Sequence, residues 1–86
     1  MEIVFTKQAI KDFEKIKTNP ALLKKVRSLL TLIEDNPFAI PPSYEKLVGL
    51  DSVYSRRINL QHRLVYQVYE SEKTIKIIRM DALRIN

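Results

Sequence analysis

The chain has 86 residues with no cysteine, and 15 Lys and Arg against 10 Asp and Glu give a formal charge of +5 at neutral pH. A hydrophobic content of 45% with 29% charged residues excludes a disordered chain, and no segment has the apolar length of a membrane span. The absence of cysteine excludes disulfides and thiolate metal sites and fits a cytoplasmic protein. We therefore expect a single domain over residues 1–86 with no membrane partner, and the net charge favours a polyanion or an acidic protein as partner.

The first half of the chain has the pattern of one strand and two helices. Residues 1–5 alternate as in a short strand, and Thr6 offers a cap for an amphipathic helix expected over residues 7–17. In that segment apolar residues recur at three-to-four spacing, and the charged residues, Asp12 among them, are expected on the solvent face. Asn19-Pro20 begins a second helix over residues 21–35, whose wide apolar stripe must pack against an apolar surface.

The second half changes to a period of two. Alternation predicts three strands joined by short turns, and short connections make the strands antiparallel; their alternating positions fall in residues 54–60, 64–68 and 75–77. Two helices placed before such a meander predict an α+β fold. In this fold both helices pack on one face of a mainly antiparallel, twisted sheet, and the other face stays open.

Arginines gather around the turn expected near Gln61. Arg57 and Arg63 lie opposite in parity to Ile58 and Leu64, so both arginines face solvent if the apolar pair faces the helices. A guanidinium matches phosphate through two hydrogen bonds, and three arginines together suggest RNA as the ligand. Glu45 can reach the same region from the side. A carboxylate base with two arginines suits RNA cleavage by attack of the 2′-hydroxyl on the adjacent phosphorus.

Alternatives stay open for several of these residues. His62 is the single histidine and is a candidate general acid, although its place in a turn favours simple exposure. Exposed arginine pairs are commonly solvated or bound to nearby acids, and a lone Glu45 is commonly a surface carboxylate. Three tyrosines suit either stacking on bases or packing across strands; they are Tyr54, Tyr66 and Tyr69. No metal site or cofactor is expected.

Three segments resemble the YoeB/Txe branch of the RelE/ParE toxin superfamily: Tyr44-Glu45-Lys46-Leu47, Tyr54-Ser55-Arg56-Arg57-Ile58-Asn59 and His62-Arg63-Leu64-Val65-Tyr66. The likeness covers nearly the whole chain. It implies a RelE-like fold and the toxin of a bacterial type II toxin-antitoxin pair, which cuts mRNA in the ribosomal A site beside 16S rRNA. The implied partners are a YefM/Axe-like antitoxin with an acidic C-terminal segment and a second copy of the chain.

The resemblance also implies roles for individual residues. Glu45 would be the general base, Arg63 would stabilise the phosphate, and Arg57 would support catalysis or bind RNA. The implied RNA-binding set is Lys46, Arg56, Arg57, His62 and Arg63. A second reading, a ParE-like protein that inhibits a protein target such as DNA gyrase, would need neither Glu45 nor the arginine pair.

The C-terminus departs from the resemblance. Relatives end in Trp, Ser or Thr, His and Tyr, with the histidine as the supposed general acid, whereas here Leu83 and Arg84 stand at the His and Tyr positions. Neither side chain can act as that acid, so this chain is expected to be an impaired nuclease. A two-nucleotide deletion after the Met80 codon, in a gene for a Met-Trp-Thr-His-Tyr-Glu ending, would produce the observed tail. A natural divergent tail is the competing explanation.

Overall fold

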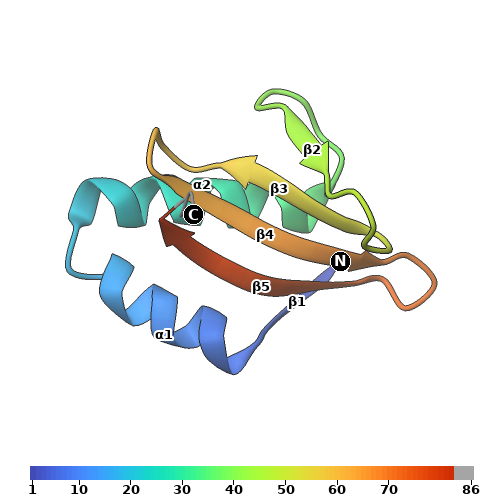
Figure 1. The fold of residues 1–86 in the computed structure, drawn as a ribbon, viewed down its shortest axis with the longest axis horizontal. Helices are drawn as coiled ribbons and strands as arrows, with labels where there is room; N and C mark the ends of the chain where they lie inside the picture. The colour runs from blue at the N-terminus through green and yellow to red at the C-terminus, as the bar shows by residue number, and fades with distance from the viewer. Residues whose placement is uncertain (83–86) are drawn as a thin grey trace.

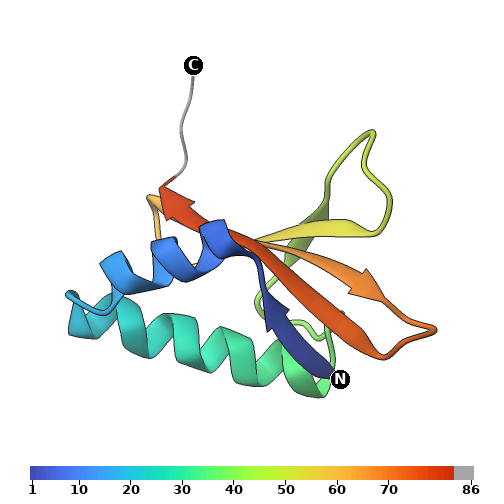
Figure 2. The same ribbon diagram turned by 90° about the horizontal axis from the view of Figure 1, so that it is seen from below.

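The computed structural model describes residues 1–82, and the tail positions Leu83 and Arg84 lie outside the described residues. One five-stranded sheet has the order β1-β5-β4-β3-β2, with β1 parallel to β5 and the other neighbours antiparallel. Both helices lie on the same side of this twisted sheet (Figures 1 and 2), which confirms the predicted α+β fold. The elements are β1 (Glu2–Phe5), α1 (Lys7–Ile16), α2 (Pro20–Asp35), β2 (Tyr44–Lys46), β3 (Val53–Arg57), β4 (His62–Tyr69) and β5 (Thr74–Ala82).

Both helices begin at the predicted caps. The Thr6 side chain accepts a hydrogen bond from the Ala9 N–H at 3.0 Å, and the Asn19 side chain accepts one from the Leu22 N–H at 3.2 Å. Each cap satisfies one of the amide groups that the first turn of a helix leaves without a partner. The helix bounds differ from the expected ones by a single residue at the end of α1 and the start of α2.

The hydrophobic core lies between the helices and the covered face of the sheet. Ile58 and Leu64 are 6% and 0% exposed and belong to this core, as their parity predicted. Ile10 has the spacing of the apolar residues of α1 but is 51% exposed, because α1 packs near the margin of the sheet (Figure 1) and only part of its apolar face is covered. None of the helices within residues 1–82 is long and apolar enough to cross a membrane.

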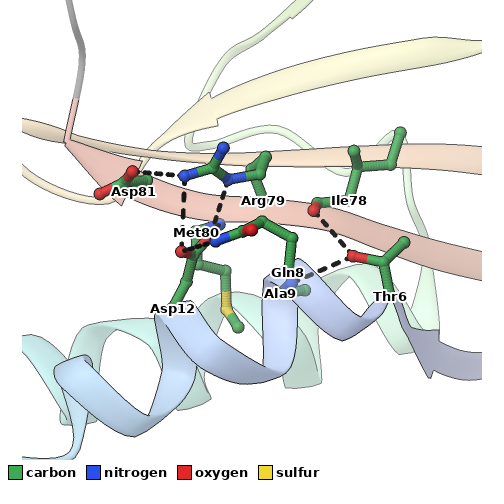
Figure 3. Close-up of polar contacts among 8 residues, drawn as sticks. All are labelled: Thr6, Gln8, Ala9, Asp12, Ile78, Arg79, Met80 and Asp81. Carbon is green, nitrogen blue, oxygen red and sulfur yellow. Dashed lines mark hydrogen bonds and ion pairs between the residues drawn. The ribbon is translucent and has the colours of Figure 1, made fainter.

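Asp12 corrects an expectation, because this residue is 2% exposed and does not face solvent. Its carboxylate accepts hydrogen bonds from the Met80 backbone N–H at 3.0 Å and from Arg79 Nε at 2.9 Å (Figure 3). Strand β1 pairs with β5 only as far as Phe5 and Ile77. Farther along β5, the Asp12 side chain replaces a neighbouring strand as the partner of a backbone amide.

The environment of Asp12 has two opposing effects on its pKa. Burial raises the pKa, because a carboxylate loses hydration on leaving water, but the hydrogen bonds from Met80 and Arg79 stabilise the ionised form. The effect of the hydrogen bonds is larger than that of burial, and the pKa of Asp12 lies below its ordinary value. The ionised Asp12 carboxylate therefore connects α1 to the end of β5.

The meander differs from its prediction in two places. Strand β3 ends at Arg57, and the chain then turns, with the Asn59 side chain accepting hydrogen bonds from the backbone N–H groups of Gln61 and His62 at 2.8 and 2.7 Å. Leu60 is consequently 86% exposed. Residues 44–46 form the edge strand β2, which the sequence did not predict because three residues are too few to show a period. This strand carries Glu45.

Candidate functional site

Three neighbouring strands bring the candidate catalytic residues to the open face of the sheet. Arg57 of β3 is directly opposite Arg63 of β4, and Glu45 of β2 is directly opposite Ser55 of β3. Opposed residues of an antiparallel pair share a face, as do residues two apart on one strand. All four side chains therefore stand on the face that the helices leave open, as the sequence predicted for the arginines.

Glu45 and Arg63 form the centre of this group. A terminal guanidinium nitrogen of Arg63 lies 3.8 Å from Glu45 Oε2, and the same nitrogen donates a hydrogen bond to Ser55 Oγ at 3.2 Å. The Arg63 side chain is 20% exposed, whereas that of Glu45 is 70% exposed. Ser55 thus helps to fix the cation at the base of the site, and the carboxylate stays accessible to a ligand.

An open pocket of about 830 Å³ lies beside this group, and its lining includes Glu45, Ser55, Arg57 and Arg63. Lys25 of α2 also lines the pocket; sequence reasoning missed it, because nothing in the local sequence places this lysine near the β3–β4 turn. Three cations beside one accessible carboxylate form a suitable environment for a phosphodiester. The cations can neutralise its phosphate, and the carboxylate can accept a proton.

Arg56 does not belong to this surface, which corrects the expectation that it binds RNA. It is 0% exposed, and its Nε donates a hydrogen bond to the Tyr66 hydroxyl at 2.9 Å. Its terminal nitrogens donate to the carbonyl oxygens of Pro42 and Pro37 at 2.6 and 2.9 Å. The alternation that turns Arg57 to the open face turns Arg56 inward, so one of the paired arginines has to be buried.

His62 and Lys46 lie at the margin of the site. His62 Nδ1 is 3.1 Å from Asn59 Oδ1, and the histidine precedes Arg63 on β4, so its side chain has the opposite parity. Lys46 follows Glu45 on β2 and pairs with Tyr54. Neither residue is among the described residues that line the pocket, and their role in RNA binding stays a prediction.

The tyrosines pack with one another and with the strands. Tyr66 is fully buried, and its ring centroid lies 5.9 Å from that of Tyr54, which also packs edge-on against Tyr44 at 5.6 Å. The Tyr69 hydroxyl donates to the Gln67 side chain at 2.8 Å. Of the two alternatives for Tyr54 and Tyr66, cross-strand packing matches these contacts.

The end of β5 carries a carboxylate, Asp81, to which the sequence analysis gave no role and which lines a smaller pocket with Asp12 and His62. Asp81 is directly opposite Arg63, which continues the row formed by Arg57 and Arg63 onto a third strand. The Arg79 guanidinium binds both Asp81 and Asp12 (Figure 3). This placement depends on the register between β4 and β5, which alternation alone cannot specify.

Two helices on one face of a mixed five-stranded sheet are the fold of the small RelE-like toxins. A family model described as YoeB-like toxin of bacterial type II toxin-antitoxin system matches residues 5–82. The chain belongs to this family.

Relatives support the assignment along nearly the whole chain. Toxin YoeB of Synechocystis sp. is 35% identical over 77 residues, which cover 87% of this chain and 90% of that protein. A YoeB/ParE toxin from Agrobacterium tumefaciens has a TM-score of 0.88 at 29% identity, covering 98% of this chain and all of the other. YoeB of Staphylococcus aureus, 36% identical with 98% of each chain covered, is known in a YoeB–YefM complex (TM-score 0.81) and as a YoeB dimer (TM-score 0.84).

Proposed function

We propose that this chain derives from a ribosome-dependent endoribonuclease that cleaves mRNA in the ribosomal A site, in the cytoplasm. The observation that supports this most directly is the 3.8 Å approach of the Glu45 carboxylate to the Arg63 guanidinium, with Arg57 paired to Arg63 beside the same open pocket. Lys46 and His62 are proposed as further RNA contacts at its margin. Arg56 is not included, because it is buried.

The proposed reaction is an internal phosphoryl transfer. Glu45 takes the proton of a ribose 2′-hydroxyl, and that oxygen attacks the adjacent phosphorus while the bond to the 5′-oxygen of the next nucleotide breaks. Arg63 and Arg57 stabilise the negative charge that develops on the phosphoryl oxygens. The products are a 2′,3′-cyclic phosphate and a 5′-oxygen that must gain a proton.

The protonation of that leaving oxygen is the step we propose to be impaired. By the family resemblance a histidine supplies this proton, and Leu83 stands at its position in this chain. Without a general acid the proton comes from water, which commonly costs about 10²–10⁴-fold in rate. The retained arginines would still allow RNA to bind.

We attribute the altered tail to a two-nucleotide deletion after the Met80 codon. Sequencing the gene with its downstream bases tests this directly. The expected result is a continuation in the other frame that encodes a Trp-Thr-His-Tyr-Glu ending followed by a stop codon. Any other continuation contradicts the deletion and leaves a natural divergent tail as the explanation.

A cell-free translation assay with mapped mRNA ends tests the nuclease proposal. The protein with residues 81–86 replaced by Trp-Thr-His-Tyr-Glu should cut mRNA at the A site of the ribosome, and a Glu45→Ala variant of it should not. A Glu70→Ala variant is the matched control, since Glu70 is an exposed glutamate at the opposite end of β4. Cleaved DNA–gyrase complexes without mRNA cuts would instead support the ParE-like alternative.

The proposed protein partners are a YefM-like antitoxin and a second copy of the chain. The staphylococcal YoeB, at 36% identity, is found in a complex with YefM and as a dimer. A net charge of +5 suits an antitoxin segment rich in acidic residues. Light scattering of the isolated protein should give the mass of a dimer. Co-expression with a YefM-like antitoxin should yield a complex whose stability falls with added salt.

A further inference from the structure

The segment between α2 and β2 is held by one buried guanidinium. Residues 36–43 form neither helix nor strand. Near the two ends of this segment, the carbonyl oxygens of Pro37 and Pro42 accept hydrogen bonds from Arg56 at 2.9 and 2.6 Å. The Tyr66 hydroxyl accepts a hydrogen bond from Arg56 Nε and donates one to the Pro37 carbonyl, each at 2.9 Å. Arg56 and Tyr66 therefore connect β3 and β4 to both ends of this segment.

The buried Arg56 guanidinium defines the positions of its hydrogen-bond acceptors but loses its hydration. Arg56 and Tyr66 are 0% exposed, and the hydrogen-bond acceptors around the guanidinium are the neutral oxygens of a hydroxyl and two carbonyls. The ring of Tyr44 lies 5.0 Å from the guanidinium carbon and adds a cation–π contact. Burying a cation is unfavourable, and an apolar side chain of similar volume would avoid the loss of hydration. A guanidinium instead offers a rigid planar set of donors that defines where each acceptor lies.

The segment leads directly into the strand that carries the candidate base. Pro42 precedes Glu45 by three residues, and Tyr44 is the register partner of Arg56. Strand β2 has three residues and lies at the edge of the sheet, paired with β3. So short an edge strand has few ladder hydrogen bonds to define its position. The hydrogen bonds that hold residues 36–43 must therefore contribute strongly to the position of β2.

We propose that Arg56 and Tyr66 are positioning residues, which set the Glu45 carboxylate at its distance from Arg63 by anchoring the chain that enters β2. The catalytic consequence rests on the proposed nuclease function. The anchoring itself does not, so the two can be tested separately.

The first test measures amide hydrogen exchange in the existing chain. Tyr66→Phe removes one hydroxyl and with it two hydrogen bonds, and should raise exchange in residues 44–47 about tenfold, the effect of a lost buried hydrogen bond. The matched control is Tyr69→Phe, which removes a tyrosine hydroxyl with a 2.8 Å hydrogen bond on the same strand and should leave residues 44–47 unchanged. Equal exchange in the two variants would overturn the anchoring.

The second test uses the protein whose residues 81–86 are replaced by Trp-Thr-His-Tyr-Glu, and it asks whether Tyr66 acts through Glu45. Tyr66→Phe should lower kcat for ribosome-dependent cleavage about tenfold, with KM changed less than about twofold, because the base is misplaced while the arginines still bind RNA. The folded fraction of this variant, measured by circular dichroism, should equal that of the parent protein with the replaced tail. A merely structural role would instead lower the folded fraction in proportion to kcat, and such a parallel loss would refute the proposal.

Arg56→Lys serves as a second variant, because it keeps the charge and loses the fixed fork. It should reproduce the exchange change in residues 44–47 and the fall in kcat. If the protein with the replaced tail shows no Glu45-dependent cleavage, the proposed nuclease function fails. The exchange comparison then still decides whether Arg56 and Tyr66 anchor the chain before β2.

Discussion

Replacing Asp12 by alanine tests whether a buried carboxylate fixes the end of β5. The substitution removes the acceptor for the Met80 backbone N–H and for Arg79 Nε, which lie 3.0 and 2.9 Å from the carboxylate. The Asp12 side chain is 1% exposed, so water cannot replace it as a partner without opening the interface between α1 and β5. We expect the free energy of unfolding to fall.

The contacts set the size of this effect. A buried backbone N–H left without a partner costs about 1–3 kcal/mol. The Arg79 side chain is 41% exposed, so solvent screens its ion pair and its loss adds only about 0–1 kcal/mol. The expected decrease is therefore about 1–4 kcal/mol. This is a large part of the total for a chain of this length at about 0.05–0.15 kcal/mol per residue.

The effect must also depend on pH in one direction. The pKa of Asp12 is lowered in the folded protein by the hydrogen bonds from Met80 and Arg79, which outweigh the effect of burial. The folded state thus binds this proton less tightly than the unfolded chain. The stabilisation is complete above the ordinary value of 3.8 and is lost as the pH falls through the lower pKa of the folded state.

Urea unfolding measures both the loss of stability and its dependence on pH. Wild type and Asp12→Ala are compared at neutral pH and at a series of pH values below 3.8, the ordinary pKa of aspartate. The difference in unfolding free energy should be present at neutral pH and shrink with acidification. Glu14→Ala is the matched control on the same helix, since the Glu14 side chain is 63% exposed and pairs with Lys17 at 3.4 Å. The control should stay within about 0.5 kcal/mol of wild type. An Asp12→Ala protein as stable as wild type, or a gap that persists in acid, would refute the reasoning.

Three further measurements follow from the structure. Leu64→Ala, at a 0% exposed core position, should lower the unfolding free energy by about 2–5 kcal/mol, whereas Leu60→Ala at an 86% exposed position should not. Arg57→Gln should weaken binding of an RNA oligonucleotide and reduce the slope of log K against log salt by about 0.7–0.9; an unchanged slope would remove Arg57 from the phosphate contacts. Burial raises the pKa of Tyr66 although the Arg56 hydrogen bond opposes it. Wild type should therefore lose stability above pH about 10 by an amount that Tyr66→Phe does not show.

Local sequence signals predicted the helix starts and the assignment of strand residues to the two faces of the sheet. The caps Thr6 and Asn19 predicted both helix starts, and alternation placed Leu64 in the core with Arg63 on the other face. Alternation also gave Arg56 the inward parity of Ile58, but its charge suggested a surface role. A guanidinium can be buried here only because distant carbonyl oxygens meet it, and sequence spacing does not report such partners.

The misplaced and missed residues depend on tertiary register. Asp12 has the helical spacing of a solvent-facing residue, and its burial follows from where β1 stops pairing with β5. The approach of Glu45 to Arg63 requires three strands in a specific register, and a shift by one residue would send Glu45 to the other face. The position of Glu45 in the sequence and the family resemblance both suggested this pair, but neither could specify the register that brings the two side chains together.

Under the proposed nuclease function, the register that places Arg57, Arg63 and Asp81 in one row predicts that Asp81 affects RNA binding. Asp81 is the register partner of Arg63, and the Arg79 guanidinium contacts both Asp81 and Asp12. A carboxylate within a Debye length of a phosphate site, about 8–10 Å, weakens the binding of an anion. Asp81→Asn should therefore raise the affinity for an RNA oligonucleotide at low salt, and Leu83→His alone should restore less activity than a change that also removes Asp81. Equal RNA affinities of wild type and Asp81→Asn would contradict this prediction and would limit the proposed effect of the tail to the general acid.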